Sequence, residues 1–146
     1  VHITNNSDLP DLSRLKPFRC VVVIEENVTE SKQKDISKWL VQSGCLYMMA
    51  WGKKCSSWDT SVDLANLELF NYGDIPDDEF VSTTWHEDEP LSEVFSYSKH
   101  CAFHSNVDLV NTVVLHLSAV SKFEQYTLRK VYHTSLFRRI NYGGDQ

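Results

Sequence analysis

The chain has 146 residues, of which 42% are hydrophobic and 23% are charged, and its formal net charge is −6. This length and composition are typical of one globular domain with a hydrophobic core, and they argue against a second domain or a low-complexity chain. The acidic balance argues against nucleic-acid binding, because phosphate backbones are bound by clustered Lys and Arg side chains, and adjacent basic residues occur here only in pairs such as Arg138-Arg139.

Membrane and secretory classes are also disfavoured. No apolar run approaches the roughly 18 residues that a membrane span needs, and the polar N-terminal segment has no signal-peptide core. The four cysteines form no C-x-x-C pair. We therefore expect reduced thiols in a cytoplasmic protein rather than a disulfide framework.

The first half of the chain alternates strand-like and helix-like patterns. Residues 1–17 are predicted to be a polar lead-in. The β-branched run 18–24 predicts a central strand covered on both faces. Thr29 is a good N-cap and Gly44 a natural C-terminal stop, so a helix is predicted between them. A second strand is predicted over 45–50.

The second half repeats this alternation. The next helix is predicted to begin within 56–59 and to end near Gly73. A third strand is predicted over 79–85, and Glu89-Pro90 opens a third helix with proline at an early helical position. The apolar run 111–118 predicts a fourth strand.

The last helix is predicted from the capping box Ser121-x-x-Glu124. The predicted domain spans 18–137, and 138–146 form a C-terminal tail. Strands that alternate with helices predict an α/β fold: a three-layer α/β/α domain around a four-stranded, mostly parallel sheet. We expect the flavodoxin-like strand order 2-1-3-4, with 3-2-1-4 as the alternative.

The carboxyl ends of parallel strands meet at one edge of the sheet, where α/β proteins bind their ligands. At this predicted rim, acidic, hydroxyl, imidazole and indole groups converge. The candidate residues are Glu25, Glu26, Trp51, Trp58, Asp59, Thr84, Trp85, His86, His116 and Ser118.

His86 is the principal catalytic candidate, with Glu25 and Asp59 beside it. A histidine oriented by a carboxylate can act as a general base. The alternative is that the acids at 87–89 only interact favourably with the positive end of the following helix. No metal is expected, and Glu25 and Glu26 are the weak candidates for holding one.

The remaining rim residues are candidates for ligand binding. Indoles give flat contact area and hydroxyls give polar specificity. His116 lies within an apolar run, which favours a hydrogen-bonded core histidine over a ligand contact. The binding candidates are Trp51, Trp58, Thr84, Trp85, His116 and Ser118.

Known cofactor motifs are absent from the sequence. There is no G-x-x-x-x-G-K-[ST] phosphate loop, no G-x-G-x-x-G dinucleotide fingerprint and no G-x-S-x-G nucleophile elbow. The cofactor is therefore left unknown.

The segment from Val21 to Asn27, with the helix that follows and Gly44-Cys45, resembles the opening of response-regulator receiver domains over residues 18–50. In that family, acids after the first strand bind Mg²⁺ near a phosphorylated Asp. Here the third strand ends in Thr83-Thr84-Trp85 where that Asp should stand. The resemblance therefore implies a similar sheet but argues against phosphotransfer.

The patterns Trp58-Asp59-x-x-Val62-Asp63 and Thr83-Thr84-Trp85-His86 resemble a family of small uncharacterised bacterial proteins. The resemblance covers most of the chain from about residue 18. It implies a single-domain cytoplasmic protein, and it transfers no activity and no residue roles.

Three functions are compatible with these observations. The first is a binding module that holds a small polar or planar molecule, or a protein partner, at the rim. The second is a hydrolase or transferase that depends on His86 or a metal. The third is an interaction protein of a mobile-element or defence system. Whether the chain is an enzyme stays open, and a free edge strand could form a homodimer.

Overall fold

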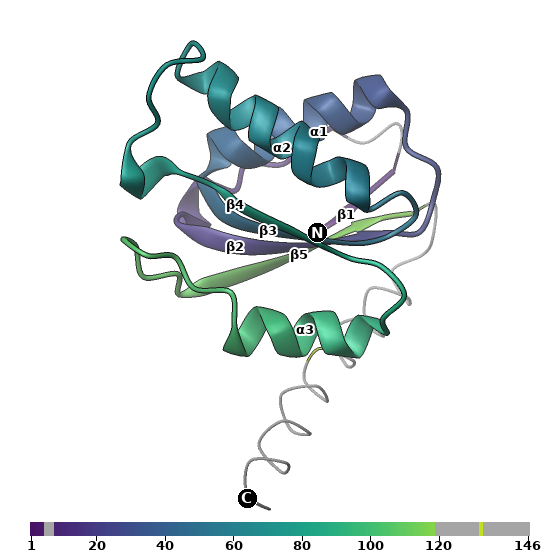
Figure 1. The fold of residues 1–146 in the computed structure, drawn as a ribbon. Coiled ribbons are helices and arrows are strands. Elements are labelled where there is room, and N and C mark those ends of the chain that lie inside the picture. The colour runs from purple at the N-terminus through teal and green to yellow at the C-terminus, as the bar shows by residue number, and fades with distance from the viewer. Residues whose placement is uncertain (5–7, 119–131, 133–146) are drawn as a thin grey trace, which may run out of the picture.

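The computed structural model describes residues 1–4, 8–118 and 132. They form one parallel sheet between layers of helices (Figure 1). No helix in these residues is long and apolar enough to cross a membrane. In chain order the elements are β1 (His2–Ile3), η1 (Ser13–Leu15), β2 (Phe18–Ile24), α1 (Glu30–Ser43), β3 (Cys45–Gly52), α2 (Ser56–Leu69), η2 (Asp77–Glu79), β4 (Ser82–His86), α3 (Leu91–His100) and β5 (Asn111–Leu117).

The sheet has five strands in the order β1-β5-β2-β3-β4, and every pairing is parallel. The parallel sheet is therefore confirmed, but the preferred flavodoxin-like order 2-1-3-4 is wrong. The four longer strands run β5-β2-β3-β4, which is the alternative order 3-2-1-4 read from the other end.

The composition of β4 explains this order. Its sequence is Ser-Thr-Thr-Trp-His, and none of its residues is fully buried. In the order 2-1-3-4 this polar strand would lie in the interior of the sheet. The structure instead puts β4 at an edge and places the more apolar β5 beside β2, where most of its side chains are buried.

The segment 1–17, expected to be only a lead-in, supplies the fifth strand. β1 pairs with β5 through His2↔His116 and Ile3↔Leu117. Ile3 and Leu12 are buried in the core. A two-residue strand is too short for alternation to be visible in the sequence.

Helices α1 and α2 cover one face of the sheet and α3 covers the other (Figure 1). The predicted ends of α1 are confirmed. Thr29 accepts a hydrogen bond from the amide of Lys32, and Gly44 adopts a left-handed conformation with φ of 100°. The third strand begins at Ser82 rather than residue 79, because 77–79 form η2. Apart from Tyr132, the predicted fourth helix and the tail 138–146 lie outside the described residues.

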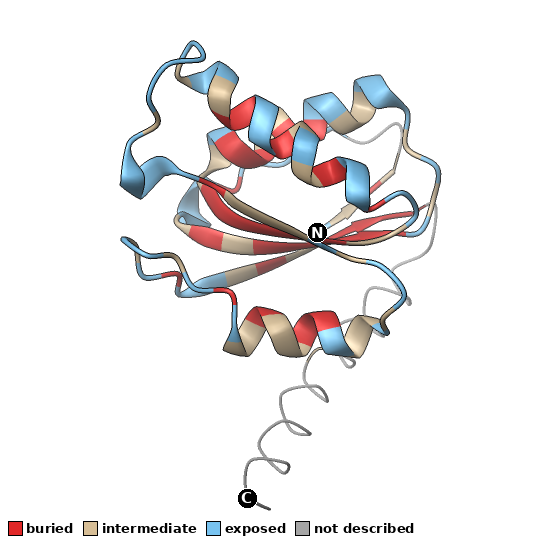
Figure 2. Ribbon diagram, viewed as in Figure 1, coloured by how far each residue is buried: buried red, intermediate tan, exposed pale blue. Residues whose placement is uncertain are grey.

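The core lies on both faces of the sheet (Figure 2). β2 is almost wholly buried, as predicted for a central strand. Trp58, Phe18 and Phe95 are the largest of the fully buried side chains. The core therefore fixes the strands whose ends carry the candidate residues.

Candidate functional site

The predicted rim exists, but its side chains do not form one site. All strands are parallel, so their carboxyl ends lie at the same end of the sheet. Successive side chains of a strand nevertheless point to opposite faces. On β4, the hydroxyl of Thr83 donates to Asp63 of α2 at 3.1 Å, whereas the His86 ring contacts Tyr97 of α3. Burial raises the pKa of Asp63 in this position, and its bond to Thr83 opposes the rise.

His86 is held between two oxygen partners on the α3 side of β4. Its Nδ1 is hydrogen bonded to Glu89, and its Nε2 lies 2.9 Å from the hydroxyl oxygen of Thr84. A carboxylate only accepts hydrogen bonds, so Nδ1 carries the proton. In the neutral ring, Nε2 then accepts the Thr84 hydroxyl. The side chain is only 9% exposed, which leaves its ring in one orientation.

The short connection between β4 and α3 places Glu89 next to His86. β4 ends at His86, α3 begins at Leu91, and the link contains Asp88 with φ of 57°. The indole of Trp51 donates to the Glu89 carbonyl oxygen at 2.8 Å and ties the link to β3. The role predicted for Glu25, orienting His86, therefore falls to Glu89.

Two tyrosines extend this polar cluster between α3 and the sheet. The Tyr97 ring meets the His86 ring edge to face, with centroids 4.9 Å apart. Its hydroxyl lies 2.6 Å from the hydroxyl of Tyr47 on β3. Burial, and then the bond to Tyr97, raise the pKa of Tyr47, so its phenol stays neutral. The rings of His86, Tyr97 and Tyr47 are therefore held in place by contacts with one another, and Tyr47 adds no charge to the cluster.

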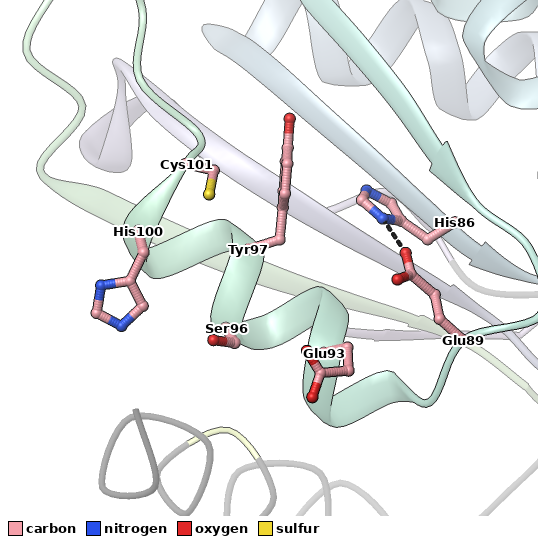
Figure 3. Close-up of a pocket in the computed structure, with 7 residues that line it drawn as sticks. All are labelled: His86, Glu89, Glu93, Ser96, Tyr97, His100 and Cys101. Atoms are coloured by element: carbon pink, nitrogen blue, oxygen red, sulfur yellow. Dashed lines mark hydrogen bonds and ion pairs between the residues drawn. The ribbon is translucent and has the colours of Figure 1, made fainter. Parts of the chain in front are cut away.

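A pocket of about 170 Å³ opens beside this cluster (Figure 3). Two carboxylates face it from α3 and the segment before it, and no Lys or Arg is among its lining residues. We call it the α3 pocket. It is lined by His86, Glu89, Glu93, Ser96, Tyr97, His100 and Cys101.

Most of these lining residues were not candidates in the sequence. The sequence indicates only a helix-end charge for Glu89, and it assigns no site role to Glu93, Ser96 or Tyr97. A signal existed: residues 89, 93, 97 and 100 follow one another at intervals of three and four, the spacing that places side chains on one face of a helix. This polar face borders the buried stripe of α3.

His116 belongs to a separate cluster where β2 and β5 end. Its Nε2 lies 3.0 Å from Glu25, and its ring centroid is 5.4 Å from that of His2. His2 in turn is hydrogen bonded to the Ser118 carbonyl oxygen. His116 and Ser118 are buried. His116 is therefore buried and hydrogen bonded, and its partner is another candidate residue, Glu25.

The other candidates divide between core and surface. Trp58 is 1% exposed and packs in the core, whereas Trp85 is 47% exposed on the α2 side of β4. The Asp59 carboxylate accepts a hydrogen bond from the backbone amide of Thr60 at 2.7 Å. Glu26 lines a hollow of only about 30 Å³ with Lys53. Within residues 1–4, 8–118 and 132, no three His, Cys, Asp or Glu side chains are placed to hold a metal ion.

A larger hollow, of about 420 Å³, lies at the opposite end of the sheet. Apolar and polar residues line it where strands begin, including Pro17, Val41, Leu46 and Leu69. It contains no histidine and does not border the rim. The α3 pocket also combines the rim with ionisable side chains, and it is larger than the hollow beside Glu26.

Fold and site together define a parallel three-layer α/β domain with an acidic pocket between the end of β4 and helix α3. The chain belongs to a family of domains of unknown function, DUF7684, whose family model matches residues 1–132. No curated protein and no solved structure matches the chain. The predicted resemblance to an uncharacterised family is confirmed in that respect, while bacterial origin stays a prediction.

Proposed function

We propose that this domain is a binding module for a small organic cation, held by an ammonium or guanidinium group in the α3 pocket. The observation that carries the proposal is the pocket's lining: the carboxylates of Glu89 and Glu93, the ring of Tyr97, and no Lys or Arg. This narrows the predicted small polar ligand to a positively charged one.

The chemistry of the lining supports a cationic group. Carboxylates accept short, charge-assisted hydrogen bonds from N–H donors, and an aromatic ring attracts a nearby cation. The pocket of about 170 Å³ is smaller than the roughly 300–1,000 Å³ of drug-sized ligand sites. It therefore suits one cationic head group rather than a nucleotide.

Isothermal titration calorimetry with ethylammonium and ethylguanidinium tests this proposal. We expect saturable binding in the millimolar range, and no binding of acetate. Glu93→Gln keeps the shape of the side chain but removes its charge, so the affinity should fall about tenfold, as expected for one lost charge-assisted hydrogen bond.

Glu30→Gln is the matched control. Glu30 lies in the first turn of α1 on the other face of the sheet, so its neutralisation should leave the affinity unchanged. The proposal fails when neither cation binds, or when Glu93→Gln and Glu30→Gln have the same effect.

One observation favours a second candidate, a hydrolase that uses His86. The series Glu89–His86–Thr84 has the order of an acid, a base and a hydroxyl nucleophile. Thr84 is not among the residues that line the pocket, which is why binding remains our first proposal. Hydrolysis of p-nitrophenyl acetate that is abolished by both Thr84→Val and His86→Gln would favour the enzyme; unchanged rates would eliminate it.

A further inference from the structure

We propose that the free edge of β4 binds an extended, basic segment of a partner protein as an added strand. One lysine or arginine side chain of that segment would enter the α3 pocket. Only the placement of this lysine or arginine in the α3 pocket rests on the proposed function. The free edge of β4, the acidic charge of its segment and the exposed Trp85 indole support the added strand independently.

The backbone of β4 is available on one side. β4 pairs with β3 from Tyr47↔Ser82 to Trp51↔His86, and in the part of the chain that the structure describes no strand pairs with its other edge. In a parallel strand, every second residue directs both its N–H and its C=O toward the same side. An exposed edge of this kind is a template for an incoming strand.

The charge of the chain segment that contains this edge favours a basic partner. Residues 55–98, which contain α2, β4 and nearly all of α3, include eleven acidic residues and no Lys or Arg. The acids are Asp59, Asp63, Glu68, Asp74, Asp77, Asp78, Glu79, Glu87, Asp88, Glu89 and Glu93. Electrostatic complementarity of this kind steers association and rejects partners of like charge.

The two faces of β4 define a pattern for the added strand. Trp85, 47% exposed, lies on the α2 side, whereas His86 and the α3 pocket lie on the other. Alternate side chains of an added strand point to these two faces. The partner should therefore alternate apolar residues, which cover the indole, with basic residues, which face the pocket.

A second copy of this chain is the less suitable occupant. Pairing two β4 edges would bring two segments of eleven acids together without a single Lys or Arg from either. Like charges placed opposite each other across an interface are repulsive. The geometry and charge thus favour a different, basic chain.

The test uses a fluorescein-labelled peptide of alternating valine and lysine, about seven residues long, which is a typical strand length. Its anisotropy is measured against the full chain. Two further peptides carry N-methyl groups on the amides of odd or of even residues. An added strand donates only from alternate amides, so one methylated peptide should lose at least about tenfold in affinity and the other should not.

Variants of the protein test the two faces. Trp85→Ala should weaken the peptide about tenfold, and Leu15→Ala, which removes another exposed apolar side chain, should not. Equal effects of the two methylated peptides would overturn the added strand. A dimer in sedimentation velocity that Trp85→Ala dissociates would also overturn it, in favour of a second copy.

The two proposals fail in different ways. Ethylammonium binding without peptide binding would overturn the added strand and leave the proposed function standing. Peptide binding that depends on alternate amides but is unchanged by Glu93→Gln would keep the strand and overturn the role of the pocket.

Discussion

The ring of His86 shows how individual residues determine what the site can do. Its two nitrogens are hydrogen bonded, one to Glu89 and the other to Thr84. A histidine held in this way donates to the Glu89 carboxylate, which also lines the pocket. The carboxylates of Glu89 and Glu93 are the reason that we expect a cationic ligand.

The sequence predicts which candidate residues lie at strand ends, but it does not predict which of them contact one another. His86, Thr84 and Trp85 were correctly placed at or near the end of β4. Alternation then separates them, because Trp85 faces away from the other two. The partners of His86 come from the start of α3, and their contacts depend on how α3 packs on the sheet, which no local pattern specifies.

Lys99 provides a prediction at the scale of one residue. Burial lowers the pKa of its ammonium group from 10.5 to about 8, next to the ring and carbonyl oxygen of Tyr132. Between these values the unfolded chain binds more protons than the folded one. The contribution of Lys99 to the free energy of unfolding should therefore rise as the pH increases from about 8 to 10.5.

Urea denaturation across this pH range measures the effect. In Lys99→Met, the part of the pH dependence that comes from Lys99 should disappear. Lys38→Met is the control, because Lys38 is a partly exposed surface residue paired with Glu68, and it should retain the wild-type slope. An identical slope in Lys99→Met and wild type would contradict the lowered pKa.

Single elements followed local rules where those rules are strong. The run 18–24 is a strand with the predicted bounds, and Thr29 and Gly44 delimit α1 as predicted. The position of β4 could not be predicted in the same way. It depends on the comparison between burying a polar strand and burying an apolar one, which involves all four strands together.

Gly52 provides a prediction at the scale of an element. It ends β3 with φ of 106°, and a Cβ atom there would lie 2.1 Å from the Ile24 carbonyl oxygen. Gly52→Ala should lower the free energy of unfolding by about 2–4 kcal/mol, because both the backbone conformation and the contact are unfavourable.

Urea denaturation monitored by circular dichroism measures this loss. Gly73→Ala is the control, since a Cβ there would meet only the Phe70 carbonyl oxygen, at 3.3 Å. Its effect should remain below about 1 kcal/mol. A Gly52→Ala variant as stable as Gly73→Ala would show that β2 and β3 can separate at their ends without cost.

Acidic and basic residues are distributed unevenly along the chain. All the Lys and Arg residues lie outside 55–98, whereas that segment holds eleven of the twenty acidic residues. The chain's net charge of −6 is therefore a poor guide to the potential near β4 and α3. The prediction that the molecule does not bind nucleic acid stands untested, and an acidic edge is consistent with it.

Quenching of tryptophan fluorescence provides a prediction at this scale. Trp85 is the exposed indole within the acidic segment, while Trp58 is buried. At low ionic strength, caesium should quench the protein more strongly than iodide, because cations concentrate near negative surfaces. Trp85→Phe should remove most of that difference. Stronger quenching by iodide would contradict an acidic surface at the β4 edge.

The most direct test of the cation pocket is an aromatic ¹H–¹³C NMR titration with ethylguanidinium. We predict saturable shifts for the rings of His86 and Tyr97, with the ring of His116 unchanged, because His116 lies in a separate cluster. Shifts of equal size in His116, or none in His86 and Tyr97 up to saturating ligand, would contradict the account.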